Sequence, residues 1–168
     1  MPDDPKYIVK PLGNENRAAF QCGQPELDHY FHERASRDMR EKLSAVFVLV
    51  TESEPGVVLG YYTLSAQQID AGELPEELKK RTGKYKRLGA TLLGRLAVAK
   101  EHQNKKLGAF LLVDALRRSL EGTQTVVSFA VVVDAKGDDV VGFYKKFGFV
   151  PLSGNRLMLP MKTIEKNF

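Results

Sequence analysis

The stretch that decides the fold is "LLGRLAVAKEHQNKKLGAFLLVDALRRSL", residues 92–120. An apolar run typical of a strand ends at a polar loop, 100–106, and an amphipathic helical pattern begins near residue 107. The nearly continuous apolar run "TVVSFAVVV", 125–133, predicts a second strand that is covered on both faces. This order predicts a parallel pair of strands, 91–99 and 125–133, joined by a right-handed crossover.

The surrounding elements predict an α/β fold with a mixed sheet. The turn "SEPG" between two apolar runs predicts an antiparallel hairpin of strands 44–52 and 57–69. Further strands are expected at 6–12 and 156–161, and helices at 25–41, 74–81 and 138–147. We therefore predict one domain, 1–168, with about six to seven strands and helices on both faces of the sheet.

Composition limits the class of protein. The chain has 168 residues, 43% hydrophobic and 27% charged, which is typical of a globular domain. Its single cysteine, Cys22, excludes an intramolecular disulfide and suits a reducing cytosol. Residues 1–13 lack the apolar segment of a secretory signal, and no apolar run reaches the ~20 residues that cross a bilayer. We expect a soluble cytoplasmic protein without a membrane partner.

The positive charge is concentrated in one segment. The net charge is +4, and the run "KKRTGKYKR", 79–87, holds six basic residues in nine. Such a run occurs as a solvated loop, and it also occurs where nucleic acid, an acidic ligand or an acidic protein binds. Composition alone does not choose between these uses.

The loop 100–106 is a candidate anion site. It joins the carboxyl end of a strand to a helix N-terminus, where unpaired backbone N–H groups and the helix dipole favour a phosphate or pyrophosphate. Lys105 and Lys106 add positive charge. The loop matches neither GxxxxGK[ST] nor GxGxxG, and an ordinary strand-to-helix connection is the alternative.

The segment "QNKKLG", 103–108, after "LGRLAV" resembles the acyl-CoA pyrophosphate loop of the GNAT superfamily of N-acetyltransferases, Q/R-x-x-G-x-G/A. Gln103 and Gly108 match the pattern. Lys106 stands in place of its first glycine, and Asn104 stands where relatives often carry glycine. The resemblance implies that acetyl-CoA is the cosubstrate, that no metal is needed, and that the loop residues bind the cofactor: Gln103, Asn104, Lys105, Lys106, Leu107, Gly108 and Ala109.

Other segments resemble one branch of that superfamily, and the likeness spans roughly 20–162. They are "GFYKKFGFVPL" (142–152), residues 20–38, "GYYTLS" (60–65) and "LLGRLAV" (92–98). The branch contains the acetyltransferase toxins of type II toxin–antitoxin systems. The resemblance implies a toxin that acetylates the α-amino group of aminoacyl-tRNA and blocks translation. It also implies a ribbon-helix-helix antitoxin as partner, and a homodimer.

The resemblance assigns roles to particular residues. The backbone of Leu96, Ala97 and Val98 is expected to pair with the pantetheine arm and polarise the thioester carbonyl. Tyr144 is expected to act as the general acid for the departing sulfur. From spacing alone, Tyr144 lies four residues after Val140 and also fits an apolar helix stripe, so a core tyrosine is the alternative.

The strand "TLLGRLAV" contains no carboxylate to act as a general base. A lysine ε-amine has a pKa near ~10.4 and an α-amine near ~7.7–8.0, so deprotonating the lysine costs about 3–4 kcal/mol more. An enzyme without a base is better matched to an α-amine, although another segment could supply one. The alternatives are a GNAT enzyme acting on a small amine or protein N-terminus, and a CoA-binding domain without catalysis, for which Lys106 is the argument.

Arg95 lies inside an apolar strand, where a charge needs a partner or an open cleft. It forms either a surface salt bridge or a contact with the acceptor end of tRNA. Lys84, Lys86 and Arg87 precede this strand, and we name them as further candidate tRNA contacts. For Cys22 we prefer a buried structural role to that of an acetyl carrier.

Overall fold

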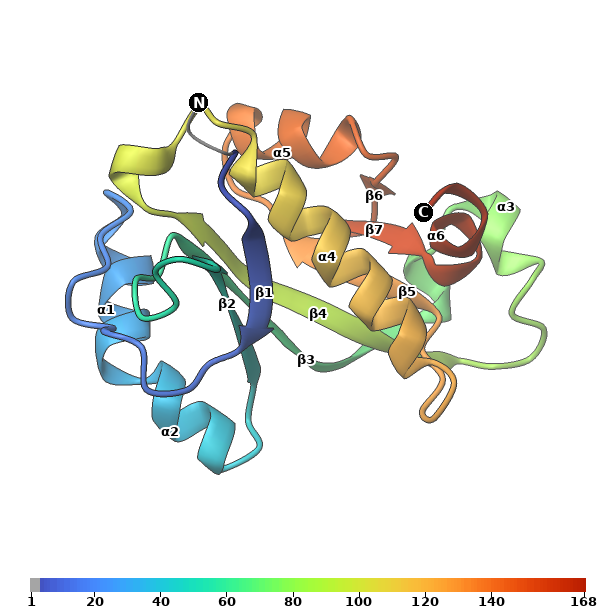
Figure 1. The fold of residues 1–168 in the computed structure, drawn as a ribbon. Coiled ribbons are helices and arrows are strands. Elements are labelled where there is room, and N and C mark those ends of the chain that lie inside the picture. The colour runs from blue at the N-terminus through green and yellow to red at the C-terminus, as the bar shows by residue number, and fades with distance from the viewer. Residues whose placement is uncertain (1–3) are drawn as a thin grey trace. The chain divides into compact units, whose positions relative to one another are not determined.

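The computed structural model describes residues 4–168, and Figure 1 shows their helices and strands. The first three residues of the segment considered for a secretory signal lie outside this range. In chain order the elements are β1 (Tyr7–Pro11), α1 (Pro25–Glu33), α2 (Ala35–Arg40), β2 (Ala45–Thr51), β3 (Gly60–Asp70), a 3₁₀ turn (Ala71–Glu73), α3 (Glu76–Lys79), β4 (Arg87–Val98), a 3₁₀ turn (Lys100–His102), α4 (Leu107–Gly122), β5 (Ala130–Asp134), α5 (Asp138–Lys145), β6 (Val150–Pro151), β7 (Arg156–Pro160) and α6 (Met161–Asn167).

The strands form one mixed sheet of seven, in the order β1-β2-β3-β4-β5-β7-β6. β2 and β3 pair antiparallel, as the turn between them predicted. β4 and β5 pair parallel, with Thr91 opposite Val131 and Leu92 opposite Val132. The predicted α/β class, the mixed sheet and the parallel pair are all confirmed.

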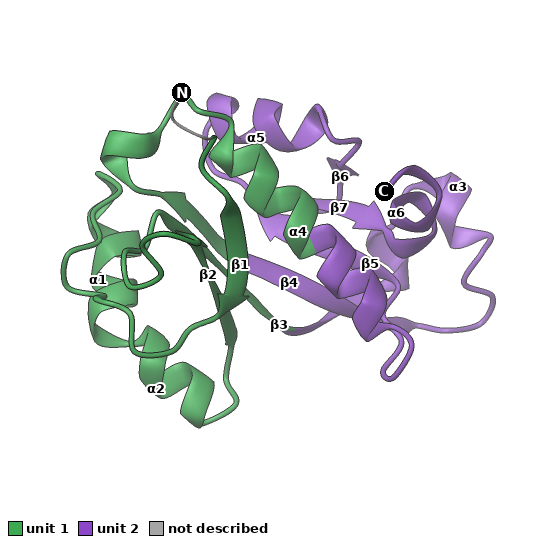
Figure 2. Cartoon of the chain, viewed as in Figure 1, with its two compact units in different colours: residues 1–65, 95–115 green, residues 66–94, 116–168 purple. Residues whose placement is uncertain are grey.

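The chain divides into two compact units (Figure 2). Unit 1 comprises residues 1–65 and 95–115, and unit 2 comprises residues 66–94 and 116–168. The elements β3, β4 and α4 each contribute residues to both units. The single domain 1–168 stays a prediction.

Two adjacent tyrosines on β3 organise the core of unit 1. Their side chains point to opposite faces because neighbouring residues of a strand alternate. The Tyr61 hydroxyl donates to the Leu27 carbonyl on α1 at 2.7 Å, and its ring stacks on Phe31 at 4.5 Å. The Tyr62 hydroxyl donates to Asp114 Oδ2 on α4 at 2.6 Å. Helices therefore lie on both faces of the sheet within unit 1, as predicted.

The predicted helix 25–41 is wrong as one element, because it is two helices that meet at Arg34. The backbone of Arg34 has φ −121°, outside the helical range. The break allows the Tyr30 hydroxyl to donate to Asp38 Oδ2 at 2.8 Å. In a straight helix these residues would be separated by about 12 Å along the axis.

The predicted strand 125–133 is wrong in its first half. β5 begins only at Ala130, and Val126 and Val127 are 75% and 82% exposed. Their β-branched, apolar side chains suggested a covered strand, but no neighbouring layer covers them. Strand β4 begins earlier than predicted, at Arg87. Near its start, the Phe129 amide donates to the Gly89 carbonyl at 2.8 Å.

Some short elements were missed: the 3₁₀ turn Lys100–His102, the two-residue strand β6 and the C-terminal helix α6. α6 buries only Met161 and Ile164, which are three residues apart. Two apolar residues are too short a pattern to predict a helix. Within residues 4–168, no helix has the length and apolarity required to cross a membrane.

Candidate active site

The loop between β4 and α4 is fixed by the side chain of Gln103. Its Nε2 donates to the Val98 carbonyl at 3.0 Å and to the Cys22 carbonyl at 2.8 Å. The Lys100 amide donates to the Gln21 carbonyl at 2.8 Å, so a second bond joins the same two segments. Gln103 therefore positions the loop through its side chain, whereas the sequence had suggested only that it binds the cofactor.

Two non-glycine residues of this loop have left-handed backbone conformations. Asn104 has φ 69° and Lys106 has φ 64°. These are the two positions at which the GNAT loop pattern or its relatives have glycine and this chain does not. Such conformations cost L-residues of order 1–2 kcal/mol, less for asparagine, and persist where the surrounding structure fixes them. The chain therefore adopts a glycine-like loop shape without the glycines.

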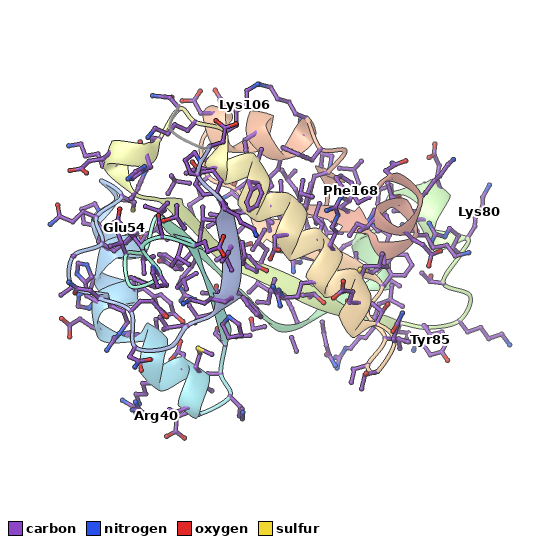
Figure 3. All side chains as sticks on the ribbon, in the orientation of Figure 1. Arg40, Glu54, Lys80, Tyr85, Lys106 and Phe168 are labelled. Carbon is purple, nitrogen blue, oxygen red and sulfur yellow. The ribbon has the colours of Figure 1, made fainter. Side chains whose placement is uncertain are left out.

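The loop offers donors and positive charge to an anion. Lys105 and Lys106 are exposed, and Figure 3 labels Lys106 just before α4. The first backbone N–H groups of α4, from Leu107 through Gly108 to Ala109, have no acceptor one turn earlier within the helix. Donors at a helix N-terminus together with two lysines fit a pyrophosphate group.

The end of β4, which leads into the loop, lies very close to the backbone of Gly60 on β3. A Cβ at Gly60 would lie only 2.8 Å from the Ala97 carbonyl oxygen and 2.8 Å from Leu111 Cδ1, so glycine is required there. Among the described pairs, the parallel ladder of β4 covers Thr91 and Leu92 and does not reach Leu96–Val98. The backbone N–H and C=O groups of Leu96–Val98 therefore fit the arm of a ligand that carries amide groups.

Arg95 stacks on an aromatic ring. Its guanidinium carbon lies 3.5 Å from the centroid of the Tyr30 ring, and residues 4–168 supply no carboxylate within ion-pairing distance. Burial and the bond to Asp38 raise the pKa of Tyr30 to about 12, so this ring stays neutral. The expected alternative of a surface salt bridge is wrong, and a cation–π contact takes its place.

Tyr144 lies on α5 in unit 2, with its ring buried between Phe143 and Phe149 at 5.2 Å from each. Burial raises the pKa of Tyr144 to about 12. Its hydroxyl makes no hydrogen bond among the described residues. The residue is 7% exposed, so its ring is part of the core, and its hydroxyl is protonated at neutral pH.

The basic segment of unit 2 is exposed. Lys84, Lys86 and Arg87 all face solvent, and Arg87 approaches Asp70 at 4.0 Å. The two lysines have no ion pair in the part of the chain that the structure describes. All three charges are accessible to a large anionic ligand.

Cys22 is 6% exposed and lies in the core of unit 1. Burial and a hydrogen bond with Asp28 raise the pKa of this thiol to about 11, so at neutral pH it is protonated and a poor nucleophile. The structural role predicted for it is confirmed. Residues 4–168 contain no group of three or more His, Cys, Asp or Glu side chains that could hold a metal ion.

Sequence reasoning missed two features of unit 1: the Arg95–Tyr30–Asp38 arrangement and the constraint on Gly60. Tyr30 and Arg95 are far apart in the chain, and no local pattern links them. Gly60 did carry a signal, because a lone glycine within a strand indicates close backbone approach.

Comparison with known proteins identifies the class. Residues 44–151 match the family described as acetyltransferase (GNAT) domain, and this chain belongs to that family of acetyltransferases. The chain is 31% identical over 146 residues to the tRNA-acetylating toxin of Mycobacterium tuberculosis, covering 86% of this chain and 85% of the relative.

Solved structures of similar fold include AtaT complexed with acetyl-methionyl-tRNAfMet, with a TM-score of 0.89 and 28% identity, over 96% of this chain and 98% of that one. Another is a tyrosine-to-phenylalanine mutant of AtaT bound to the C-terminus of the antitoxin AtaR and acetyl-CoA. Its TM-score is 0.81 and its identity 26%, over 96% of this chain and 97% of that one.

Proposed function

We propose that this acetyltransferase is a toxin that uses acetyl-CoA to acetylate the α-amino group of aminoacyl-tRNA and thereby blocks translation. The observation that supports this substrate class is the structural similarity to AtaT, which spans 96% of the chain. The structure of AtaT was solved in complex with acetyl-methionyl-tRNAfMet. An acetylated α-amine has lost the nucleophile that peptide-bond formation requires.

The cofactor assignment rests on the loop and strand of unit 1. Residues 103–109 would bind the pyrophosphate through backbone N–H groups and the two lysine charges. The segment Leu96–Val98 would pair with the pantetheine arm and polarise the acetyl carbonyl through its backbone. Acetyl-CoA, when bound, supplies the acetyl group as an activated thioester.

We assign Tyr144 as the proton donor to the leaving sulfur. Its hydroxyl makes no hydrogen bond with the described residues, and its raised pKa keeps the proton in place throughout the physiological range. The core packing of the ring restricts where the hydroxyl can point. A positioned donor of this kind contributes typically ~10²–10⁴-fold to a rate.

An α-amine as acceptor is favoured by strand β4, because residues 87–98 carry no carboxylate that could act as a general base. A sizeable fraction of an amine with a pKa of ~7.7–8.0 is already neutral near pH 7.5, so no dedicated base is needed. The pKa falls further when the adjacent carboxyl is esterified. The rate should therefore rise with pH as this amine deprotonates and then become level.

Contacts to tRNA are assigned to Arg95 in unit 1 and to Lys84, Lys86 and Arg87 in unit 2. Arg95 keeps its in-plane N–H donors available because the contact with Tyr30 uses the face of the guanidinium. The exposed cations of unit 2 suit phosphates. A ribbon-helix-helix antitoxin, a homodimer, a single domain and a cytoplasmic location complete the proposal.

The test is transfer of labelled acetyl from acetyl-CoA to a pool of charged tRNA, run beside a lysine peptide and spermidine. We expect label on the charged tRNA and a much weaker signal on the two amines. Label only on the peptide or spermidine would leave a general acetyltransferase. Label on none of them, with acetyl-CoA still bound in a separate titration, would favour a non-catalytic CoA-binding domain.

A further inference from the structure

One aromatic side chain of the basic segment is unexplained by the fold. Tyr85 is 74% exposed and lies between Lys84 and Lys86, and Figure 3 labels it in the loop that leads into β4. Its side chain makes no hydrogen bond, ring contact or cation–π contact with the described residues. The ring therefore contributes almost nothing to the packing of unit 2.

The backbone that carries this ring is nevertheless held on both sides. Before it, Thr82 is buried, its Oγ1 donates to the Lys79 carbonyl at 2.9 Å, and its carbonyl accepts from the Tyr85 amide at 3.2 Å. After it, the Lys86 carbonyl accepts from the Ala71 amide at 2.8 Å. The ring is thus presented by an ordered turn and is not part of a loose tail.

The surroundings of Tyr85 select the chemistry of its ligand. An exposed ring between cations matches the way proteins bind single-stranded nucleic acid, with bases stacked on aromatic faces and phosphates beside basic side chains. A second copy of this chain would bring the same positive charge against this surface, which is unfavourable. Bases inside a duplex are covered on both faces by their neighbours, so an unpaired base offers the better stacking surface.

We propose that Tyr85 stacks on an unpaired base of the RNA substrate, while Lys84 and Lys86 contact the adjoining phosphates. The proposal rests on the proposed function and adds the residue that recognises unpaired RNA. An unpaired base is available both at the 3′ end of tRNA and in its loops.

The chain contains no tryptophan, so Tyr85→Trp places a single fluorescent indole at this position. We expect its emission to be quenched strongly by a single-stranded RNA oligonucleotide and by uncharged tRNA, and much less by a blunt RNA duplex of equal length, in which only the terminal pairs have an uncovered face. Equal quenching by the duplex, or none by any RNA, would overturn the proposal. Quenching that disappears for tRNA lacking its unpaired 3′ nucleotides assigns the base to that end, and quenching that persists assigns it to a loop.

Matched variants test the contribution of the ring to binding. Tyr85→Ala should weaken binding of the single-stranded oligonucleotide roughly five- to 150-fold, whereas Tyr85→Phe should stay within about twofold of the wild type. Acetyl-CoA binding should be the same in all three proteins. Unchanged RNA affinity in Tyr85→Ala, or a change only in its self-association, contradicts stacking on RNA.

These measurements use uncharged RNA and no acetyl transfer, so they succeed or fail separately from the proposed function. If the wild type transfers no acetyl to charged tRNA while the indole is still quenched, the proposed function fails and the base-stacking site remains. If transfer occurs without quenching, the stacking site is refuted and the proposed function stands.

Discussion

Two lysine-rich segments of this chain differ in what fixes their backbone. In loop 103–106, two hydrogen bonds from Gln103 fix the backbone, and two residues adopt left-handed conformations. In segment 79–87, the turn is ordered by backbone bonds, yet Lys84, Tyr85 and Lys86 project freely. A small, rigid anion is best bound by a preorganised backbone, and a long flexible polyanion by adaptable side chains. We therefore propose that the same composition serves two kinds of ligand.

The largest effect should come from a residue outside both segments. Tyr144→Phe keeps the buried ring and removes only the hydroxyl, so acetyl transfer should fall by about 10²–10⁴-fold. Acetyl-CoA and tRNA affinities should stay within about twofold, because neither segment is altered. Single-turnover kinetics with charged tRNA measure the rate of acetyl transfer, and calorimetry measures the two affinities. A variant with full turnover would remove the acid role from Tyr144.

The wild-type pH profile sharpens this assignment. Because the pKa of Tyr144 is raised to about 12, its protonation does not change between pH 6 and 9. The single-turnover rate should rise with the neutral fraction of the substrate amine and then level, without a descending limb in this range. A fall between pH 8 and 9 that Tyr144→Phe abolishes would show that Tyr144 ionises far below this value.

The next effect concerns the basic segment 79–87. Replacing Lys84, Lys86 and Arg87 together by glutamine should reduce the slope of log affinity against log salt for tRNA by about 2–3, since each lost phosphate contact removes ~0.7–0.9. A matched triple variant of other exposed lysines, at positions 136, 162 and 166, should leave the slope nearly unchanged. Equal slopes for the two triple variants would show that the charges of 79–87 act only as solvated groups.

A smaller effect is expected in the rigid loop. Gln103→Met keeps the length of the side chain and removes both hydrogen bonds, which should lower the free energy of unfolding by about 1 kcal/mol. The loosened loop should also bind acetyl-CoA about tenfold more weakly, with tRNA affinity unchanged. Gln124→Met, at an exposed position after α4, is the control. Equal effects of the two changes would contradict the positioning role.

The smallest effect isolates backbone strain. Lys106→Gly and Lys105→Gly remove the same charge, but only Lys106 has a positive φ. The Lys106 variant should therefore be more stable than the Lys105 variant by about 1 kcal/mol in urea unfolding. If the order is reversed, the left-handed conformation of Lys106 carries no strain.

Local patterns predicted most of the fold and the position of the loop. The strand 91–99, the following loop and the helix from 107 could be predicted because periodicity and helix-start signals are local. The run 125–133 misled because β-branched residues favour a strand only where another layer covers them, and Val126 and Val127 are exposed.

The candidate site was predictable in its types of residue but not in its contacts. Lys106 in place of glycine was the argument for a domain without catalysis, yet this residue adopts a left-handed conformation in a loop that the side chain of Gln103 anchors. The pairing of Arg95 with Tyr30 depends on tertiary packing between distant segments, which periodicity cannot reveal.

The most direct test of the central claim is to locate the transferred acetyl group. Charged tRNA is incubated with acetyl-CoA and the full-length protein, the amino acid is released by mild base, and its mass and fragmentation are measured. We predict an acetyl group on the α-nitrogen of the released amino acid, formed by the wild type and largely absent with Tyr144→Phe. An unmodified amino acid, or acetyl recovered only on the RNA or on a side-chain amine, would contradict the account.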